Sequence, residues 1–581
     1  MGTRIWDLRR GDDDDNRSSP PGGSFHALIL PTILELNYLK ASLCFLVLII
    51  GPAILVGLAL SVVATYWEFL SHAASATRSS LVTGVGSLLA LFLVALWLGR
   101  RFVSAVVINA RHLHYSLIFP IFVAVREVLQ TIGARIGRGS ADPERLWKRR
   151  RVATILAAFL FCVAGLALGL TIEVSTGLKL VNVERVSFWA TAKSALGNAA
   201  IILGFSTVFE SSLWLWRELR LKSPVLDWVG EPPIADSSIL RVAHLSDVHL
   251  VGDPYGYRME TGRSGPRGNR RFRKAIRKLR EIHAQIPLDR ILVTGDVTDA
   301  GTRAEWLTFV SLLRECKEFR ERLSFVPGNH DVNIVDRNNP GRFDMPWSAG
   351  MALRKLRFVL ILDAIQGERT YVVDRSSLKL GPTLREYLRM GNRASLLCEL
   401  ATRSSIRGRI EIAKVWNGLF PLVEPATSDR GCGLILLDSN APAHFSLTNA
   451  IGVVNPIQLK ALKALLNNFP SARWILMLHH QVVEYPDASI PLRDRIGLAL
   501  VNAPELLATI MPHASRVIML HGHRHRDWIG TCGDVVLCSA PSVTLGAEES
   551  EENLGSFHIH RIALENSRNL RLISTERIKV A

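Results

Sequence analysis

The sequence has few cysteines, and the seven among its 581 residues are scattered, with no Cys-x-x-Cys pair. Disulfide frameworks and cysteine-based zinc sites need paired or closely spaced cysteines, so the sequence excludes both and suits a reducing cytosol. Aromatic residues make up only 7% of the chain. They are too few for the stacking platforms that bind single-stranded nucleic acid, and we expect no specific nucleic-acid binding.

A cleaved signal peptide is also lacking, because the first long apolar run begins only near Leu43 and is too long for such a peptide. Residues 1–40 begin as a polar stretch with an acidic run at 12–15, which predicts a polar cytoplasmic tail. Position 6 is Trp6 rather than serine or threonine, so myristoylation of Gly2 is not favoured.

Long apolar runs are present, by contrast, and they predict a membrane region over residues 41–216. A spanning helix needs about 20 apolar residues. Four segments approach or reach that length, and they are 43–67, 81–99, 152–172 and 188–209. The last is the weakest because it contains Lys193 and Asn198. The alternative interpretation is that these segments are buried helices of a large soluble protein.

Loop charge predicts how this region is oriented. Residues 100–151 carry eleven lysines and arginines against three acids, whereas the loops 68–80 and 173–186 carry one and two basic residues. Basic loops stay in the cytoplasm, so the tail, the 100–151 loop and everything after Trp216 should lie there. The sequence thus predicts a multi-pass protein of the inner or plasma membrane. Contact with the lipid bilayer then explains much of the net charge of +17.

From residue 239 to 581 short apolar strands alternate with helical stretches, after a proline-containing linker over 217–238. This alternation predicts an α/β fold with stacked layers. The expected strands are 240–245, 290–294, 323–326, 434–437, 473–478, 516–520, 535–539, 556–562 and 570–574. The expected helices include 270–283, 304–319 and 456–468. Residues 337–430 interrupt the rhythm, and we expect them to be a mostly helical insertion or cap.

Five of the predicted strands end in side chains that can bind metals. Any one of these blocks has an ordinary explanation, such as a polar turn with a chance histidine. Five blocks in the same structural position make coincidence improbable, since α/β folds hold ligands at the carboxyl ends of their strands. The blocks are Asp247-Val248-His249, Gly295-Asp296, Gly328-Asn329-His330-Asp331, His479-His480 and His521-Gly522-His523-Arg524-His525.

These residue types fit a site for two divalent ions. Such a site needs one carboxylate to bridge the ions, with imidazole and oxygen ligands that leave positions open for water and substrate. In an Asp-x-His sequence, alternate residues that leave a strand can face the same side. A glycine before Asp296 lets the backbone pass close to the ions.

The ordered set Asp-x-His, Gly-Asp, Gly-Asn-His-Asp, His and Gly-His-x-His resembles the calcineurin-like metallophosphoesterase superfamily. It is most similar to the branch that contains class III cyclic-nucleotide phosphodiesterases. The resemblance covers roughly 240–575, with 337–430 unmatched, and it does not extend to the membrane region. It implies a layered α/β/β/α sandwich.

The resemblance also implies a role for each residue. Asp247, His249 and His525 would hold one metal. Asn329, His479 and His523 would hold the other, and Asp296 would bridge both. His330 would not bind metal but would stabilise the charge on the substrate or protonate the leaving oxygen, with Asp331 orienting its ring. His480 could replace His479 as a ligand.

The implied activity is hydrolysis of a phosphodiester or phosphomonoester bond by a hydroxide that two divalent metal ions activate. The metals would be Mn, Fe or Zn, and the expected substrate is a nucleotide-like phosphate ester. One alternative is a hydrolase of a membrane lipid phosphate or a nucleotide-linked lipid diphosphate. Another, from a different class, is a metal-binding sensor that no longer turns over.

Overall fold

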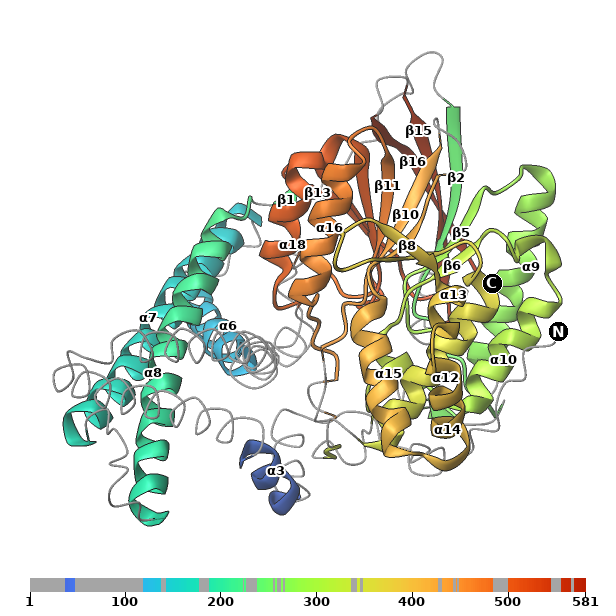
Figure 1. Cartoon of the computed structure of the whole chain (residues 1–581). Coiled ribbons are helices and arrows are strands. Elements are labelled where there is room, and N and C mark those ends of the chain that lie inside the picture. Colours follow the sequence, from blue (N-terminus) through green and yellow to red (C-terminus); the bar gives the residue numbers. More distant parts are fainter. Residues whose placement is uncertain are drawn as a thin grey trace, which may run out of the picture. The chain divides into compact units, whose positions relative to one another are not determined.

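Figure 1 shows the computed structural model of the chain, whose described residues fall into two compact units, one up to Arg220 and one from Leu221 onward. The described residues are 37–46, 119–136, 143–176, 188–222, 224–225, 238–253, 257–258, 263–264, 267–335, 342–344, 348–426, 431–441, 446, 449–483, 500–544, 555–565 and 569–580.

The first unit is helical. Its helices are α3 (Tyr38–Phe45), α6 (Phe119–Ile136), α7 (Pro143–Thr176) and α8 (Phe188–Arg220). The backbones of α7 and α8 meet at a pair of glycines, since a Cβ on Gly165 would lie 2.6 Å from the carbonyl oxygen of Gly204. Small residues at a crossing allow this close approach. An ion pair of 2.5 Å between Arg150 and Glu218 also joins the two helices.

One described helix could cross a membrane by its length and composition. This is the stretch Glu144–Ile172 of α7. Its most apolar 18 residues have a mean hydropathy of 2.6, and only 22% of them are buried. It contains the predicted span 152–172. Residues 188–209 are helical, as part of α8, but α8 does not meet the same criterion. The predicted spans 43–67, beyond residue 46, and 81–99 lie outside the described residues.

The second unit has a mixed α/β fold built on two sheets, which lie at its centre in Figure 1. The nine-stranded sheet has the order β1-β13-β14-β12-β11-β10-β9-β7-β8, and the five-stranded sheet has the order β16-β15-β2-β5-β6. The five-stranded sheet is made of β2 (Ser238–Leu245), β5 (Arg290–Val293), β6 (Leu323–Phe325), β15 (Ser556–Leu564) and β16 (Leu570–Lys579).

The nine-stranded sheet is made of β1 (Pro224–Val225), β7 (Tyr371–Val373), β8 (Leu380–Thr383), β9 (Leu422–Glu424), β10 (Cys432–Leu436), β11 (Arg473–Met477), β12 (Val517–His521), β13 (Trp528–Cys532) and β14 (Val535–Ser539). Two short strands, β3 (Tyr257–Arg258) and β4 (Arg263–Ser264), form a separate hairpin.

Helices pack on the sheets through apolar stripes. Phe272, Ala275 and Leu279 recur at helical spacing on α9 (Arg267–Gln285), and these side chains are buried in the core with the strands of the five-stranded sheet. Helix α10 (Arg303–Arg314) lies beside α9 in Figure 1. Helices α16 (Pro456–Asn468) and α18 (Ala503–Ile510) lie on the other side of the sheets, next to the nine-stranded one.

All nine strands expected from the sequence are present within a few residues of their expected bounds. The three expected helices are also present, although 304–319 divides into α10 and the 3-10 helix η4 (Lys317–Phe319). Strand β13 and the short strands β1, β3, β4, β7, β8 and β9 were not expected.

Residues 337–430 were expected to be a mostly helical insertion or cap, and the structure describes most of them. The segment is rich in helices, namely α12 (Ala349–Gln366), α13 (Leu384–Arg389), α14 (Arg393–Arg403) and α15 (Ile406–Leu419). It also supplies β7, β8 and β9, which complete one edge of the nine-stranded sheet. Phe358 and Trp416 from this segment are buried in the main core. The segment is therefore part of the core rather than a cap over it.

Candidate metal centre

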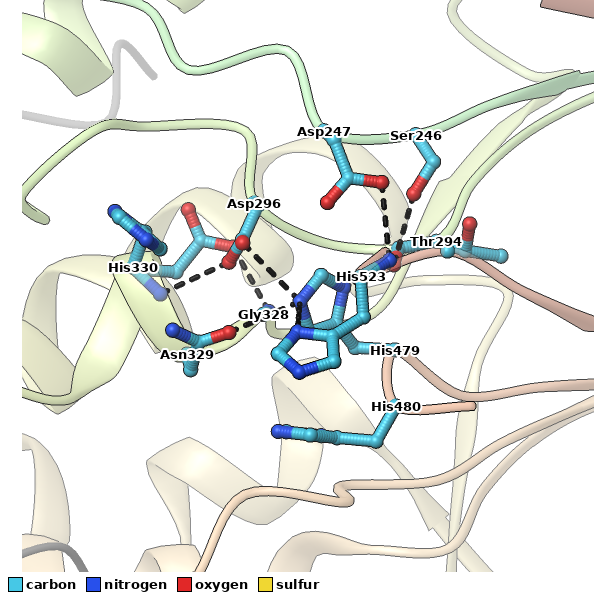
Figure 2. Close-up of polar contacts among 12 residues, drawn as sticks. Ser246, Asp247, Thr294, Asp296, Gly328, Asn329, His330, His479, His480 and His523 are labelled. Atoms are coloured by element: carbon cyan, nitrogen blue, oxygen red, sulfur yellow. Dashed lines mark hydrogen bonds and ion pairs between the residues drawn. The ribbon is translucent and has the colours of Figure 1, made fainter. Parts of the chain in front are cut away.

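The five metal-capable blocks come from strands that run parallel within each sheet. Strands β2, β5 and β6 are parallel neighbours in one sheet, and β11 and β12 are parallel neighbours in the other. The carboxyl ends of parallel strands meet at the same edge, so the following loops lie together. Figure 2 shows the side chains of these loops pointing toward one another around Asp296.

Backbone hydrogen bonds hold the loops after β2 and β5 against each other. The backbone N–H groups of Val248 and His249 both donate to the carbonyl oxygen of Asp296, at 2.8 and 3.0 Å. The hydroxyl groups of Ser542 and Thr544 donate to the carbonyl oxygens of Asp247 and Val248, at 2.6 and 2.7 Å. The first block is thus fixed from two sides.

The candidate ligands have an unusual backbone conformation. Seven non-glycine residues in the described part of the chain have positive φ, and five of them are candidate metal ligands. These five are Asp247, His249, Asp296, His523 and His525, with φ between 46° and 77°. Aspartate and histidine tolerate the left-handed region better than most residues, but each such residue costs on the order of 1 kcal/mol or more. Strain of this kind concentrates at functional sites.

Glycines make room where two blocks touch. A Cβ on Gly328 would collide with the backbone nitrogen and the carboxylate of Asp296. A Cβ on Gly295 would lie 2.6 Å from the ring nitrogen Nδ1 of His479. The Gly-Asp and Gly-Asn pairs are therefore required by the close approach of the loops after β5 and β6, and not only by turn geometry.

The candidate ligands form three overlapping groups. In each group, one ligand atom of every member lies within 4.8 Å of those of the others. The groups are Asp247 with His249 and His525, His249 with Asp296 and His330, and Asp296 with His479 and His523. Asp296 belongs to two of them, and its Oδ2 atom lies 3.1 Å from Nε2 of His479 and 3.8 Å from Nε2 of His249. This central position suits a bridging carboxylate.

His479 rather than His480 lies in the metal-capable group. Its Nε2 atom is 3.1 Å from Oδ1 of Asn329 and 3.1 Å from Nδ1 of His523. Its Nδ1 atom lies 2.7 Å from the carbonyl oxygen of Thr294, which can only accept, so Nδ1 carries a proton. Nε2 is then the metal-facing nitrogen. The neighbouring His480 points its Nδ1 atom at the hydroxyl of Ser439 instead, at 2.9 Å.

Asp331 was expected to orient the His330 ring, and the structure gives the ring a backbone partner. Nδ1 of His330 lies 2.7 Å from the carbonyl oxygen of Asp299, and this backbone group orients the ring. The carboxylate of Asp331 instead accepts from the backbone N–H groups of Gly328 and Thr298, each at 2.9 Å. Asp331 therefore ties the loops after β5 and β6 together, and its effect on His330 is indirect.

The charges in this site are strongly coupled. Burial opposes ionisation of Asp296, but the nearby His479 and His330 hold the pKa of its carboxyl well below its usual range. Burial disfavours charge on His479 as well, yet Asp296 prevails and raises the pKa of His479 to about 9. Burial lowers the pKa of His523 well below its usual range, and His480 adds to this. Without metal, a protonated His479 thus pairs with ionised Asp296.

The donor set fits divalent metal ions. Two carboxylates, one amide oxygen and four imidazoles converge, and all except His525 are almost fully buried. Imidazole nitrogen with carboxylate oxygen suits Mn, Fe and Zn. Buried, nearly water-free carboxylates of this kind need positive partners, which metal ions would supply.

Two residues that support the site were not predicted from the sequence. Thr294 and Asp299 act through their carbonyl oxygens, on His479 and His330 respectively. A backbone carbonyl has no signature in the residue type, so only the fold reveals these contacts. Asp299 also places its carboxylate 3.4 Å from Nδ1 of His249. Its position three residues after Asp296 is the one sequence signal for that role.

Three solved structures are similar to parts of the chain. The first is a Staphylococcus aureus protein in complex with α-ketoglutarate, at 13% identity and a TM-score of 0.32, with 59% of this chain and 54% of that chain covered. A dimetal phosphatase from Danio rerio is 16% identical with a TM-score of 0.32, over 60% of this chain and 100% of that chain. Sulfate thiohydrolase SoxB from Thermus thermophilus is 13% identical with a TM-score of 0.29, over 61% and 58%.

The chain thus spans about half the length of the first of these structures. No curated protein matches it.

Residues 240–392 match the family of calcineurin-like phosphoesterases. The match is shorter than the 240–575 expected from the motifs, and it runs into the segment expected to be unmatched. It includes Asp247, His249, Asp296 and the block 328–331, and the fold adds His479, His523 and His525 beyond it. Residues 240–392 of the chain therefore belong to a calcineurin-like phosphoesterase domain.

Proposed function

We propose that the chain is a membrane-anchored phosphoesterase that uses two divalent metal ions to hydrolyse a phosphodiester or phosphomonoester of a nucleotide-like substrate. The observation that carries this proposal is the position of Asp296, which belongs to one ligand group with His479 and His523 and to another with His249 and His330. His249 in turn belongs to the group of Asp247 and His525, so Asp296 stands between the two proposed sets of ligands. A single carboxylate shared between two sets of buried ligands is the arrangement that a pair of ions requires.

Each ion would have its own set of ligands, and one carboxylate would be common to both. Asp247, His249 and His525 would hold one ion, Asn329, His479 and His523 the other, and Asp296 both. When bound, the ions supply positive charge to the phosphoryl oxygens and lower the pKa of water toward ~7. The loops with left-handed backbone hold the ligands in place before substrate arrives, so little reorganisation is needed during the reaction.

His330 is placed to handle a proton at Nε2. Because Nδ1 donates to the carbonyl oxygen of Asp299, Nε2 of the neutral ring carries no proton. A ring protonated on both nitrogens can donate from Nε2 to the leaving oxygen. Its side chain is 6% exposed, which places it at the boundary between the buried ligands and solvent.

The membrane part of the proposal rests on α7. Large apolar side chains along this helix are exposed, among them Phe159 at 63%, Val152 at 56% and Leu160 at 49%. Exposed apolar surface of this extent is covered by lipid in a membrane protein. We propose four spans, at 43–67, 81–99, 152–172 and 188–209, with the phosphoesterase domain in the cytoplasm. Alkaline carbonate extraction of cell membranes tests the anchoring, since a soluble protein would be released.

Hydrolysis by the purified full chain in detergent, loaded with Mn²⁺, tests the reaction. The substrates are bis-p-nitrophenyl phosphate, p-nitrophenyl phosphate, a cyclic nucleotide, a nucleoside monophosphate and a lipid diphosphate. Preference for the nucleotide substrates supports the proposal. Preference for the lipid diphosphate would mean that the substrate is a membrane lipid rather than a nucleotide. The exposed apolar surface of α7 is compatible with that outcome as well. Bound metal without turnover on any substrate would indicate a sensor.

A further inference from the structure

A second cluster of buried histidines lies in the phosphoesterase domain, apart from the residues assigned above. Its members are His244 on β2 and His558 and His560 on β15, and all three are fully buried. One ring nitrogen of each lies within 4.8 Å of the others. The ring centroids of His560 are 5.3 Å from His244 and 5.4 Å from His558. We call this group the histidine cluster.

Strand register brings the three side chains together. His244 and His558 are directly opposite each other in the antiparallel pair of β2 and β15. His560 follows two residues later on β15, so its side chain leaves the same face as His558. Cross-strand neighbours of this kind have side chains in contact. Three imidazoles are thus held on regular strands, where the backbone leaves little freedom.

Each ring has an oxygen partner on one nitrogen, which leaves the other nitrogen for the cluster. Nε2 of His558 lies 2.9 Å from Oδ1 of Asp527, and Nε2 of His244 lies 3.0 Å from the hydroxyl of Thr294. Nδ1 of His560 lies 2.8 Å from the hydroxyl of Thr575. Histidines that bind metal nearly always donate the outer N–H to an oxygen in this way.

The inward nitrogens include one that the protein does not satisfy. Nδ1 of His244 and Nε2 of His560 are 3.1 Å apart. Nδ1 of His558 is buried with no hydrogen-bond partner among the described residues. The carboxylate of Asp527 accepts a hydrogen bond from Nε2–H of His558, so Nδ1 of the neutral ring carries a lone pair. An unsatisfied buried acceptor is costly, and a single proton shared by His244 and His560 would not relieve it.

We propose that the histidine cluster is a third metal site, which holds one zinc-like divalent cation through Nδ1 of His244, Nδ1 of His558 and Nε2 of His560. Tetrahedral zinc with Zn–N bonds of ~2.0–2.1 Å sets neighbouring nitrogens roughly 3.3 Å apart. The observed 3.1 Å between His244 and His560 is close to that value. Three neutral imidazoles suit zinc, and burial favours the neutral form of two of them, since it lowers the pKa of His244 and of His560 well below the usual range.

The role of this third site is structural, and it also supports the first centre. It cross-links β2 to β15 within the core, where all three imidazoles are fully buried. Thr294 links it to the candidate metal centre, because its hydroxyl contacts His244 and its carbonyl oxygen accepts from His479.

Zinc content of the full chain tests the proposal. The variant Asp247→Asn/Asp296→Asn removes both carboxylates of the candidate metal centre and is loaded with Zn²⁺, then washed on a desalting column. We expect about one zinc per chain by mass spectrometry of the metals, and loss of that zinc when His558→Leu is added. His513→Gln, which removes a histidine outside the cluster, should keep it. The zinc K-edge absorption should show three nitrogen ligands near 2.0–2.1 Å and no sulfur ligand.

Two outcomes would overturn the proposal. One is a folded Asp247→Asn/Asp296→Asn chain, by circular dichroism, that retains no zinc. The other is zinc that stays bound after His558→Leu. If the carboxylate variants do not fold, anomalous diffraction at the zinc edge from the unmodified chain decides. A peak among His244, His558 and His560 supports the site, whereas a water molecule or empty density there excludes it.

Discussion

The two histidine-rich regions of the phosphoesterase domain are built in opposite ways. The candidate metal centre stands on loops, and five of its ligands have left-handed backbone. The histidine cluster stands on two paired strands with regular register. The centre includes the carboxylates of Asp247 and Asp296, whereas the cluster offers imidazoles alone to its interior.

This difference separates a reactive site from a structural one. Loops allow ligands from five strands to converge while the front of the site, at His330 and His525, stays near solvent. Strands give a closed group that substrate cannot reach. Bridging carboxylates hold two ions and leave coordination positions open, and imidazoles with fixed outer partners hold one ion firmly. The following predictions test whether the centre and the cluster differ in this way.

The largest effect is expected for Asp296→Asn. The variant loses the charge shared between the two ligand groups, which is worth several kcal/mol of transition-state stabilisation. We expect kcat to fall by about 10³-fold or more, with loss of metal from the centre. Turnover and metal content measured together check this. Asp289→Asn, which lies at the backbone N–H of Arg241, is the matched control. Normal metal content and normal turnover in Asp296→Asn would contradict the two-ion centre.

His330→Gln should reduce turnover without removing metal. Loss of a positioned proton donor costs about 10²–10⁴-fold in kcat. A ligand variant, by contrast, loses metal and turnover together. The informative measurement is kcat with a substrate whose leaving group has a low pKa, because such a group needs no proton. If kcat falls equally for that substrate, His330 stabilises the charge on the substrate rather than protonating the leaving oxygen.

Gly328→Ala should disturb the centre through packing alone. The added Cβ collides with Asp296, so the loop after β6 must move. We expect at least a tenfold weaker apparent affinity for Mn²⁺, or roughly 1.4 kcal/mol. Isothermal titration of metal-free protein measures it. Gly350→Ala on α12 is the control, since its nearest neighbour would be 3.7 Å away and alanine favours a helix. If Gly328→Ala and Gly350→Ala bind Mn²⁺ with equal affinity, the loop after β6 can move to accommodate the added Cβ without disturbing the ligands.

The smallest effect is expected for Glu305→Gln, and it concerns stability against pH. Burial, with a contribution from Asp299, raises the pKa of Glu305 to about 8. The folded state therefore binds more protons than the unfolded state between about pH 4.5 and 8, and the stability of the unmodified chain falls as pH rises through that window. Glutamine keeps the hydrogen bonds from Ala300 and Thr302 and carries no charge. The variant should gain relative stability over this window.

Thermal unfolding of both proteins between pH 5 and 9 checks the Glu305 prediction. The difference in melting temperature should be near zero at pH 5 and should grow up to about pH 8. A difference that does not change with pH would mean that Glu305 is ionised in the folded chain throughout.

The sequence predicted the strands well because buried parallel strands read as short apolar runs. All five metal-capable blocks were found, since each follows such a run. Strand β13 was missed because Gly530 and Thr531 interrupt its apolar character, and β7, β8 and β9 were missed because they are short and lie among helices. The carbonyl of Asp299 and the backbone angles of the ligands depend on tertiary structure and have no pattern in the sequence.

The histidine cluster was also outside the sequence prediction. His558-Ile559-His560 lies within a strand rather than at its end, and its partner His244 is 314 positions earlier than His558. Only the register of β2 against β15 brings them together. Membrane spans were predicted from composition, and the described part of the chain contains one helix of the required length and character.

The left-handed backbone of the ligands limits which amino acids can replace them during evolution. At Asp247 and Asp296 a substituting residue must both bind metal and accept positive φ, and asparagine, histidine and aspartate satisfy both conditions better than glutamate or cysteine. The backbone thereby narrows the chemistry available to the site. In a descendant of this chain, histidine nitrogen could replace the aspartate oxygen at these positions more readily than cysteine sulfur could. The backbone conformation therefore limits which metals the site can bind, in addition to their affinity for the ligands.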